Sequence, residues 1–272
     1  MKNRFIILID FSPYSEHLIE FAYTWSKSIN AEMLLVHNTI VLLLALTPYE
    51  SKIELTRIAN AEALEKLKKY AESVLPKEAS FKFLVSERHL VYQLRALLRG
   101  PYNNLVFLGL KGTGLLKKIF IGSEAVKVID RIDNLIVAVP YKPDCCSHET
   151  VYVAVHKNYP LNIIEFNKFL NFGKNQISKI VFFSGLTPDD DLYYAEKYLR
   201  DLVDLYSDKY HVSYEKYEAE SGFQDLKRVI AGKKNEFIVV QKGSKMFLDQ
   251  MFRKLLINEL VYEGNIPLVI LP

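Results

Sequence analysis

The sequence repeats one plan of alternating apolar runs and helical segments twice along its 272 residues. Short apolar runs are typical of buried strands, and the segments between them have the apolar spacing of amphipathic helices. Such alternation favours parallel sheets covered by helices on both faces. We therefore expect an α/β fold of two tandem, open, five-stranded parallel sheets. The expected strands are 6–9, 33–38, 81–85, 105–108 and 135–139 in the first copy, and 151–155, 179–183, 212–217, 237–240 and 268–271 in the second.

The helices between these strands are predicted from periodicity and from start signals. Ser12 and Pro13 suit the N-cap and first position of the first helix. Thr187 and Pro188 mark the start of another, and the three acids at 189–191 fit a helix start, where they complement the dipole, better than a metal site. The other expected helices are 53–74, 89–98, 124–132, 161–172, 189–206, 223–231 and 245–262.

A break in periodicity separates the two copies. Residues 141–150 include a proline and the adjacent Cys145 and Cys146, and they follow neither a helical nor a strand pattern. We place a linker there, between a first domain of residues 1–140 and a second domain of residues 151–272. Neighbouring cysteines rarely bond to each other, so the pair indicates a reducing compartment and supports no metal site.

Three glycines follow the fourth strand of the first copy with the spacing G-x2-G-x9-G-[ST]. They are Gly109, Gly112 and Gly122, and Ser123 comes next. Open α/β sheets bind ligands at the carboxyl ends of their strands, where glycines take positive φ and let a phosphate approach the backbone amides. Gly122 and Ser123 also stand at the expected start of a helix, whose first N–H groups attract anions. The spacing predicts a triphosphate cradle, with a simple turn as the alternative.

This spacing resembles that of the universal stress protein family, in which the glycines lie between the fourth strand and the last helix and contact the phosphates and ribose of ATP. The run from Ile6 to Ser12 resembles the family's first strand with its Asp-Phe-Ser ending, and 33–38 resembles the second strand. The resemblance covers nearly the whole chain and matches the tandem members of the family. It implies a Rossmann-like fold related to that of the adenine nucleotide α-hydrolases.

The resemblance also implies nucleotide-binding roles for particular residues. Asp10 takes the place of the family's Asp near the adenine and ribose, and Asn38 lies at the strand end that touches the adenine through its backbone. His37 occupies a position that is often His in the family, and we expect it to be a structural histidine. The predicted site therefore comprises Asp10, Asn38, Gly109, Gly112, Gly122 and Ser123.

The second copy departs from the family pattern at each of these places. His156 or Lys157 stands where the first copy has Asp10, and only Gly243 remains of the glycines. We expect this copy to keep the scaffold without the nucleotide site. The alternative is a different anion site formed by the basic residues His156, Lys242, Arg253 and Lys254.

Composition argues against several classes of protein. The formal net charge is only +3 and the basic residues are scattered, so nothing indicates nucleic acid as a partner. The longest apolar stretch, 40–46, is far shorter than the ~20 residues that cross a bilayer, and the first residues show no signal-peptide pattern. We expect a cytoplasmic protein with no membrane partner. The 40–46 stretch is then either packed on the sheet or a surface for a protein partner.

The histidines and acids show none of the spacings of common catalytic or metal sites. Without a placed base and a metal carboxylate, ATP, which would bring its own Mg²⁺, would be hydrolysed slowly at best. The sequence therefore predicts an adenine-nucleotide-binding sensor or switch of the stress response that acts on an unknown protein partner. The alternative is a protein-interaction module of the same fold that works without nucleotide.

The final strands of the two copies predict how the copies associate. In single-domain universal stress proteins, two protomers join through these strands. Here 135–139 and 268–271 can make that contact within one chain, which removes reactive edges from both sheets. We therefore expect an internal pseudo-dimer, with any further homodimer using another surface such as 40–46.

Overall fold

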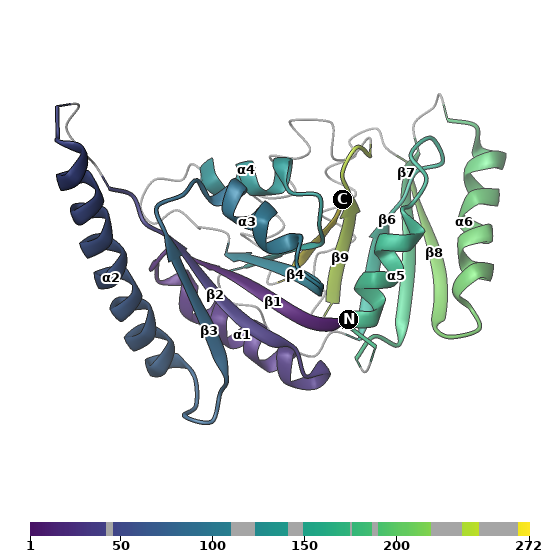
Figure 1. Ribbon diagram of the computed structural model, residues 1–272. Coiled ribbons are helices and arrows are strands. Elements are labelled where there is room, and N and C mark those ends of the chain that lie inside the picture. The colour runs from purple at the N-terminus through teal and green to yellow at the C-terminus, as the bar shows by residue number, and fades with distance from the viewer. Residues whose placement is uncertain are drawn as a thin grey trace. The chain divides into compact units, whose positions relative to one another are not determined.

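The computed structural model describes residues 1–41, 46–109, 123–140, 149–174, 176–186, 190–218, 236–244 and 266–272. Over these ranges the chain forms an α/β fold with ten strands and six helices (Figure 1). It divides into two compact units. The first unit comprises residues 1–109 and 123–134, and the second contains the described residues from 135 onward.

Four parallel strands form the sheet of the first unit, in the order β3-β2-β1-β4. From β1 the chain adds β2 and β3 on one side, and β4 is then added on the other side, so the strand order reverses between β1 and β4. Open parallel sheets bind ligands beside the carboxyl ends of the two strands at such a reversal. The bounds are Lys2–Ile9 for β1, Glu32–Asn38 for β2, Phe81–Ser86 for β3 and Tyr102–Gly109 for β4.

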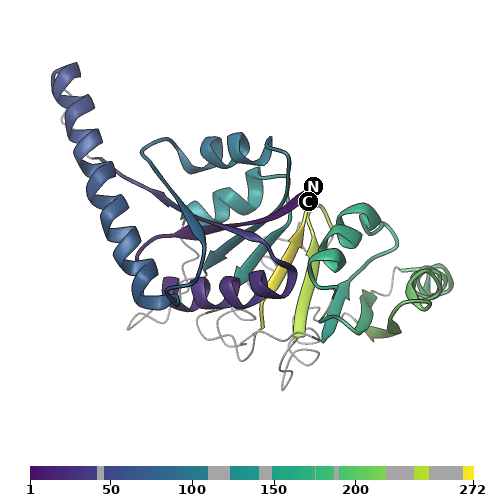
Figure 2. The same ribbon diagram turned by 60° about the horizontal axis from the view of Figure 1, so that its bottom comes forward.

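Helices cover both faces of this sheet. Helix α1 lies on one face, whereas α3 and α4 lie on the other (Figures 1 and 2). The core beneath α1 is aromatic: the ring of Phe5 lies 4.7 Å from that of Phe107 and 5.6 Å from that of Trp25. All three side chains are fully buried, so they fix α1 across β1 and β4. The helices are α1 Tyr14–Ile29, α2 Tyr49–Val74, α3 Leu90–Leu98 and α4 Ser123–Arg131.

Helix α2 packs on the sheet along only part of its length. Leu67 and Ala71 are its buried residues, and they lie in the half nearer its C-terminus. Tyr49 and Ile53 fall on the same helical stripe, yet they are 77% and 52% exposed. The first turns of α2 extend beyond β3 in the same unit (Figure 1). The apolar stripe of α2 therefore continues past the sheet that its C-terminal half covers.

Three expected helix starts are corrected by the structure. Helix α1 begins at Tyr14, and no side chain caps it, so Ser12 is not its N-cap. Helix α2 begins at Tyr49, four residues before the expected start, and its first turn is exposed. Helix α6 begins at Leu192, three residues after the expected start, and Asp191 caps it as the acids at 189–191 predicted.

The second unit repeats the same order of strands and contains two more, β5 and β10. Strands β6 to β9 are parallel, with β7 and β8 on one side of β6 and β9 on the other, so the order reverses between β6 and β9. Strand β10 pairs in parallel with β9. The bounds are β5 Ile136–Val139, β6 Thr150–Ala154, β7 Lys179–Leu186, β8 His211–Glu218, β9 Glu236–Gln241 and β10 Leu268–Leu271.

The expected contact between 135–139 and 268–271 is confirmed. Strand β5 pairs antiparallel with β10, with Val137 opposite Val269 at the centre of the register. All residues of both strands are buried. Although β5 was counted with the first copy from its sequence position, it packs with the second unit, where it is the one antiparallel member among the described strands. The domain boundary at 141–150 stays a prediction, because most of that range lies outside the described residues.

Two described helices pack on the second sheet, α5 Ile163–Phe172 and α6 Leu192–Tyr206. Phe166 of α5, Tyr206 of α6 and Phe182 of β7 lie with ring centroids 5.4 to 6.2 Å apart, so both helices pack on the same face. The expected helices 223–231 and 245–262 lie outside the described residues.

Candidate functional site

The topological switch point of the first unit, where the strand order reverses between β1 and β4, brings Asp10 and Gly109 together. Asp10 directly follows β1, and Gly109 ends β4, whose residues pair in register with those of β1 up to Leu8 and Leu108. The Oδ1 atom of Asp10 accepts hydrogen bonds from the Ser12 N–H, at 3.0 Å, and from the Ser15 hydroxyl, at 3.1 Å. These bonds orient the carboxylate at the exposed end of β1.

Phe11 has an unusual backbone conformation, with φ at 56°. A positive φ is costly for a bulky residue and is found where surrounding contacts hold it. The ring of Phe11 lies 4.3 Å from that of His37, and the ammonium of Lys66 lies 4.3 Å from the Phe11 centroid. The hydroxyl of Tyr70 donates to the Ser12 carbonyl at 3.2 Å. Helix α2 thus supplies two residues that hold the turn after β1.

His37 links the ends of β1 and β2. Its Nδ1 atom lies 2.8 Å from the Ile9 carbonyl, which can only accept, so Nδ1 carries the proton and donates. Burial lowers the pKa of His37 below its ordinary value, and the charge of Lys66 lowers it further, whereas the bond to Ile9 and the charge of Asp10 raise it. The expectation of a structural histidine agrees with this geometry.

The side chain of Asn38 is engaged by the neighbouring strand end. Its Nδ2 atom donates to the carbonyls of Ser86, at 2.8 Å, and Arg88, at 2.6 Å. Both bonds tie β2 to the chain that leaves β3. These bonds use the amide nitrogen of Asn38, and the family resemblance indicates its backbone as the group that contacts the adenine.

Gly109 lies next to the start of α1. A Cβ atom there would lie 3.7 Å from Leu18 Cδ2 and 4.0 Å from Tyr14 Cβ, which are ordinary contacts. Protein packing therefore does not require a glycine at this position. Among the described glycines only Gly243 has a positive φ, so the expectation of positive φ does not hold for Gly109. The absence of a side chain remains the physical property that distinguishes it.

The rest of the predicted cradle is described only in part. Gly112 and Gly122 lie outside the described residues. Ser123 begins α4, as expected for a residue at a helix start. The structure therefore brings together Asp10 and Gly109 and places Asn38 at the next strand end of the same sheet edge.

The corresponding reversal of the second unit is filled by protein groups. Gln241 ends β9, in the position of Gly109, and its side chain bonds the start of α5. Its Oε1 atom accepts from the Asn162 N–H at 2.6 Å, and its Nε2 atom donates to the Pro160 carbonyl at 3.1 Å. Asn162 is the N-cap of α5, so a side-chain amide occupies the helix start that would otherwise face a ligand.

His156 stands in the position of Asp10 and is buried. Its Nδ1 atom accepts from the Asn158 N–H at 3.2 Å, and its Nε2 atom lies 3.3 Å from Asp190 Oδ1, at ion-pair distance but without hydrogen-bond geometry. Both side chains are 7% exposed. A buried histidine beside a carboxylate is not available to an anion, which argues against its place in the alternative anion site. Arg253 and Lys254 lie outside the described residues.

Sequence reasoning missed Lys66, Tyr70 and the contacts of Gln241. Lys66 and Tyr70 belong to an amphipathic helix rich in lysine and glutamate, where their contact with Phe11 and Ser12 leaves no local pattern. A signal for Gln241 was present, because it interrupts the glycine spacing in the second copy.

In the described part of the chain, no helix is both long and apolar enough to span a bilayer. Nor do the described residues contain a group of three His, Cys, Asp or Glu side chains that could bind a metal ion.

Solved structures match this architecture, although no protein-family model and no curated protein matches the sequence. A universal stress protein from Archaeoglobus fulgidus DSM 4304 is similar with a TM-score of 0.67 at 15% identity, over 100% of this chain and 98% of that one. This chain has the universal stress protein fold. Because the match spans both chains almost completely, it extends over both units.

Two further structures show how widely the fold is used. A putative universal stress protein from Pseudomonas aeruginosa UCBPP-PA14 matches with a TM-score of 0.58 at 9% identity, over 99% of this chain and 93% of that one. The cytoplasmic domain of a prokaryotic cation chloride cotransporter matches with a TM-score of 0.54 at 10% identity, over 99% and 95%. At such identities the likeness concerns the universal stress protein fold alone, which does not decide the function.

Proposed function

We propose that the chain binds one adenine nucleotide, ATP in the first instance, at the strand reversal of the first unit, and that it acts as a sensor or switch of the stress response. The observation that supports this most is the difference between Gly109 and its counterpart Gln241. Gly109 presents no side chain to the start of α1, whereas the amide of Gln241 bonds the start of α5. The oriented carboxylate of Asp10 lies at the same reversal.

The described residues fit such a ligand. A carboxylate beside a strand end can accept from ribose hydroxyls, and a glycine at the next strand end lets phosphates approach the backbone. Gly112, Gly122 and the start of α4 at Ser123 would supply backbone N–H groups to the phosphates, and Mg²⁺ would arrive with the ATP. The sequence has none of the common catalytic spacings, and we therefore propose a binding role in the cytoplasm with at most slow hydrolysis.

A second candidate function is that of a protein-interaction module that works without nucleotide. Two observations favour it. The fold is shared with a domain of a cotransporter. The apolar stripe of α2 continues into solvent, where Leu46 is 95% and Tyr49 is 77% exposed. This surface adjoins the 40–46 stretch, the region proposed for a homodimer or an unknown protein partner.

Identification of the ligand that copurifies with the chain separates the two candidates. Protein purified rapidly without added nucleotide is denatured, and the released small molecules are analysed by mass spectrometry. The first proposal predicts an adenine nucleotide in the released fraction, and the same analysis of a Gly112→Val variant should find none. Unsubstituted protein without nucleotide, which also fails to bind added ATP, would support the interaction module instead.

A further inference from the structure

Lys66 is placed beside the candidate site by helix α2, which sequence reasoning did not connect with nucleotide binding. Its ammonium lies 4.3 Å from the ring centroid of Phe11, the residue that follows Asp10. Such a cation–π contact at an exposed position is worth about 0.5–1 kcal/mol. The contact directs a long, flexible side chain toward the carboxyl end of β1.

Lys66 differs from Lys68 on the same helix in its ion pairing. Among the described residues, no carboxylate lies within ion-pair distance of its ammonium, whereas Lys68 on the same helix pairs with Glu65 at 2.7 Å. Lys66 and Asp10 both lie close enough to His37 for their charges to act on it in opposite directions. A positive group from α2 and a negative group that follows β1 therefore both act on His37 at the end of β2.

We infer that Lys66 determines specificity at this site by favouring phosphorylated nucleotides over the nucleoside. The inference rests on the proposed function and assigns to α2 a part in it. Near Asp10 alone, a polyphosphate would meet a carboxylate of its own sign, which costs free energy. The ammonium of Lys66 offsets that charge for an anionic ligand, and it adds little for an uncharged one such as adenosine.

The test compares ATP and adenosine as ligands of the full-length chain by calorimetric titration at low ionic strength. Lys66→Met removes the charge but keeps an apolar stem that can cover Phe11, and Lys66→Arg keeps the charge. Lys68→Met removes one charge from the same helix at a position that does not contact Phe11. We expect Lys66→Met to weaken ATP binding about tenfold, with adenosine binding unchanged. Lys66→Arg and Lys68→Met should bind both ligands as the unsubstituted chain does.

A second readout shows whether the substitution acts through charge. Because Lys66 lowers the pKa of His37, Lys66→Met should raise the pKa of His37 in an NMR titration, whereas Lys68→Met should not. Unchanged ATP affinity in Lys66→Met, or equal losses for ATP and adenosine, would overturn the inference while the proposed function stands. An unsubstituted chain that binds neither ligand would overturn the proposed function, and this inference with it.

Discussion

The strand reversals of the two units have the same topology but differ in what lies beside them. In the first unit Gly109 presents no side chain to the start of α1, whereas in the second unit the amide of Gln241 bonds the start of α5. Asp10 is exposed after β1, whereas His156 is buried next to Asp190 after β6. Among the described residues, protein side chains therefore bond the strand ends of the second unit, whereas Gly109 provides no side chain in the first.

We propose that the second unit keeps the fold without the nucleotide site. Gln241 makes two hydrogen bonds to the backbone around Asn162. Buried and half-buried polar groups need such partners. Gln241 thus satisfies the helix start from within the protein, which Gly109 cannot do in the first unit.

The largest effect is expected when the second unit's residue is placed in the first. Gly109→Gln should abolish ATP binding, because the amide would occupy the space beside the start of α1. Gly109→Ala is the matched control for folding, since a Cβ there meets only ordinary contacts. Titration calorimetry measures binding, and urea unfolding should give similar midpoints for both variants. ATP affinity that survives Gly109→Gln would show that this space is not used by the nucleotide.

A smaller loss is expected from Asp10. Asp10→Ala should weaken ATP binding about tenfold, because one hydrogen bond to a charged group is worth roughly 1.5–3 kcal/mol. Asp10→Asn keeps an oxygen that can accept from Ser12 and Ser15, and it therefore separates loss of the turn from loss of the charge. The assignment of Asp10 fails if Asp10→Ala binds ATP as tightly as the unsubstituted chain.

The reverse exchange in the second unit tests stability instead of binding. Gln241→Gly removes both hydrogen bonds to the start of α5, and it should lower the free energy of unfolding by about 1–2 kcal/mol. It should create no second nucleotide site, because His156 remains buried where Asp10 is exposed in the first unit. Urea denaturation and ATP titration measure the two effects. A second ATP bound by this variant would mean that Gln241 alone prevents ATP binding in the second unit.

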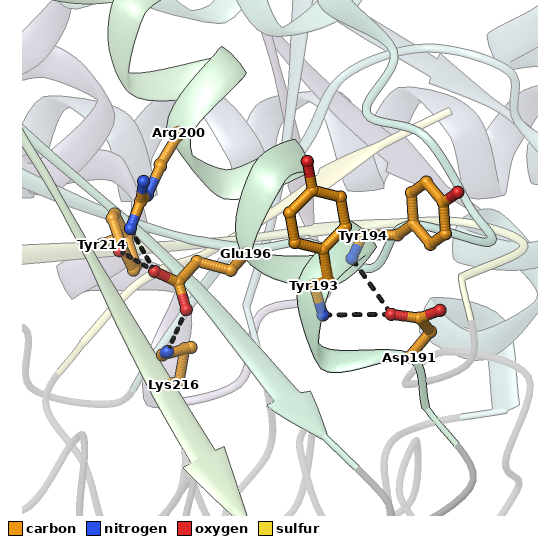
Figure 3. Close-up of polar contacts among 7 residues, drawn as sticks. All are labelled: Asp191, Tyr193, Tyr194, Glu196, Arg200, Tyr214 and Lys216. Carbon is orange, nitrogen blue, oxygen red and sulfur yellow. Dashed lines mark hydrogen bonds and ion pairs between the residues drawn. The ribbon is translucent and has the colours of Figure 1, made fainter.

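The smallest effect concerns an ionic network on the outer helix of the second unit (Figure 3). Lys216, Arg200 and Tyr214 all donate to the Glu196 carboxylate, and these bonds lower its pKa to about 2. A carboxyl pKa lowered in the folded state stabilises the fold above its unfolded value of 4.5, and this contribution is lost as the pH falls toward 2. The network lies at the protein surface, where 28% of the Glu196 side chain is exposed, so the contribution is small.

Glu196→Gln makes this pH dependence measurable. The unsubstituted chain should be slightly more stable than the variant above pH 4.5, and the difference should narrow as the pH falls toward 2. Urea midpoints of both proteins across this range provide the measurement. Glu165→Gln, which breaks another surface pair with a lysine on α5, is a matched control. A difference that grows in acid would contradict the sign of the argument.

Much of the fold could be predicted because strands and helices produce local patterns of apolar residues in the sequence. The apolar run 105–108 lies within β4, and the expected contact of the last two strands is present as β5 and β10. The early start of α2 was missed because its first turns extend beyond the buried part of the helix and are exposed. The Lys66–Phe11 and Gln241–Asn162 contacts were missed because they join residues far apart in the sequence.

The central claim is that only the first unit retains a nucleotide site, and the number of ATP molecules bound per chain tests it most directly. Calorimetric titration of the full-length chain, freed of any copurified ligand, gives this number. Gly109 has no side chain, whereas the Gln241 amide is hydrogen-bonded to the start of α5, and this difference predicts a stoichiometry near one. A stoichiometry of two equivalent sites would contradict the loss of the site in the second unit, and no binding would contradict its retention in the first.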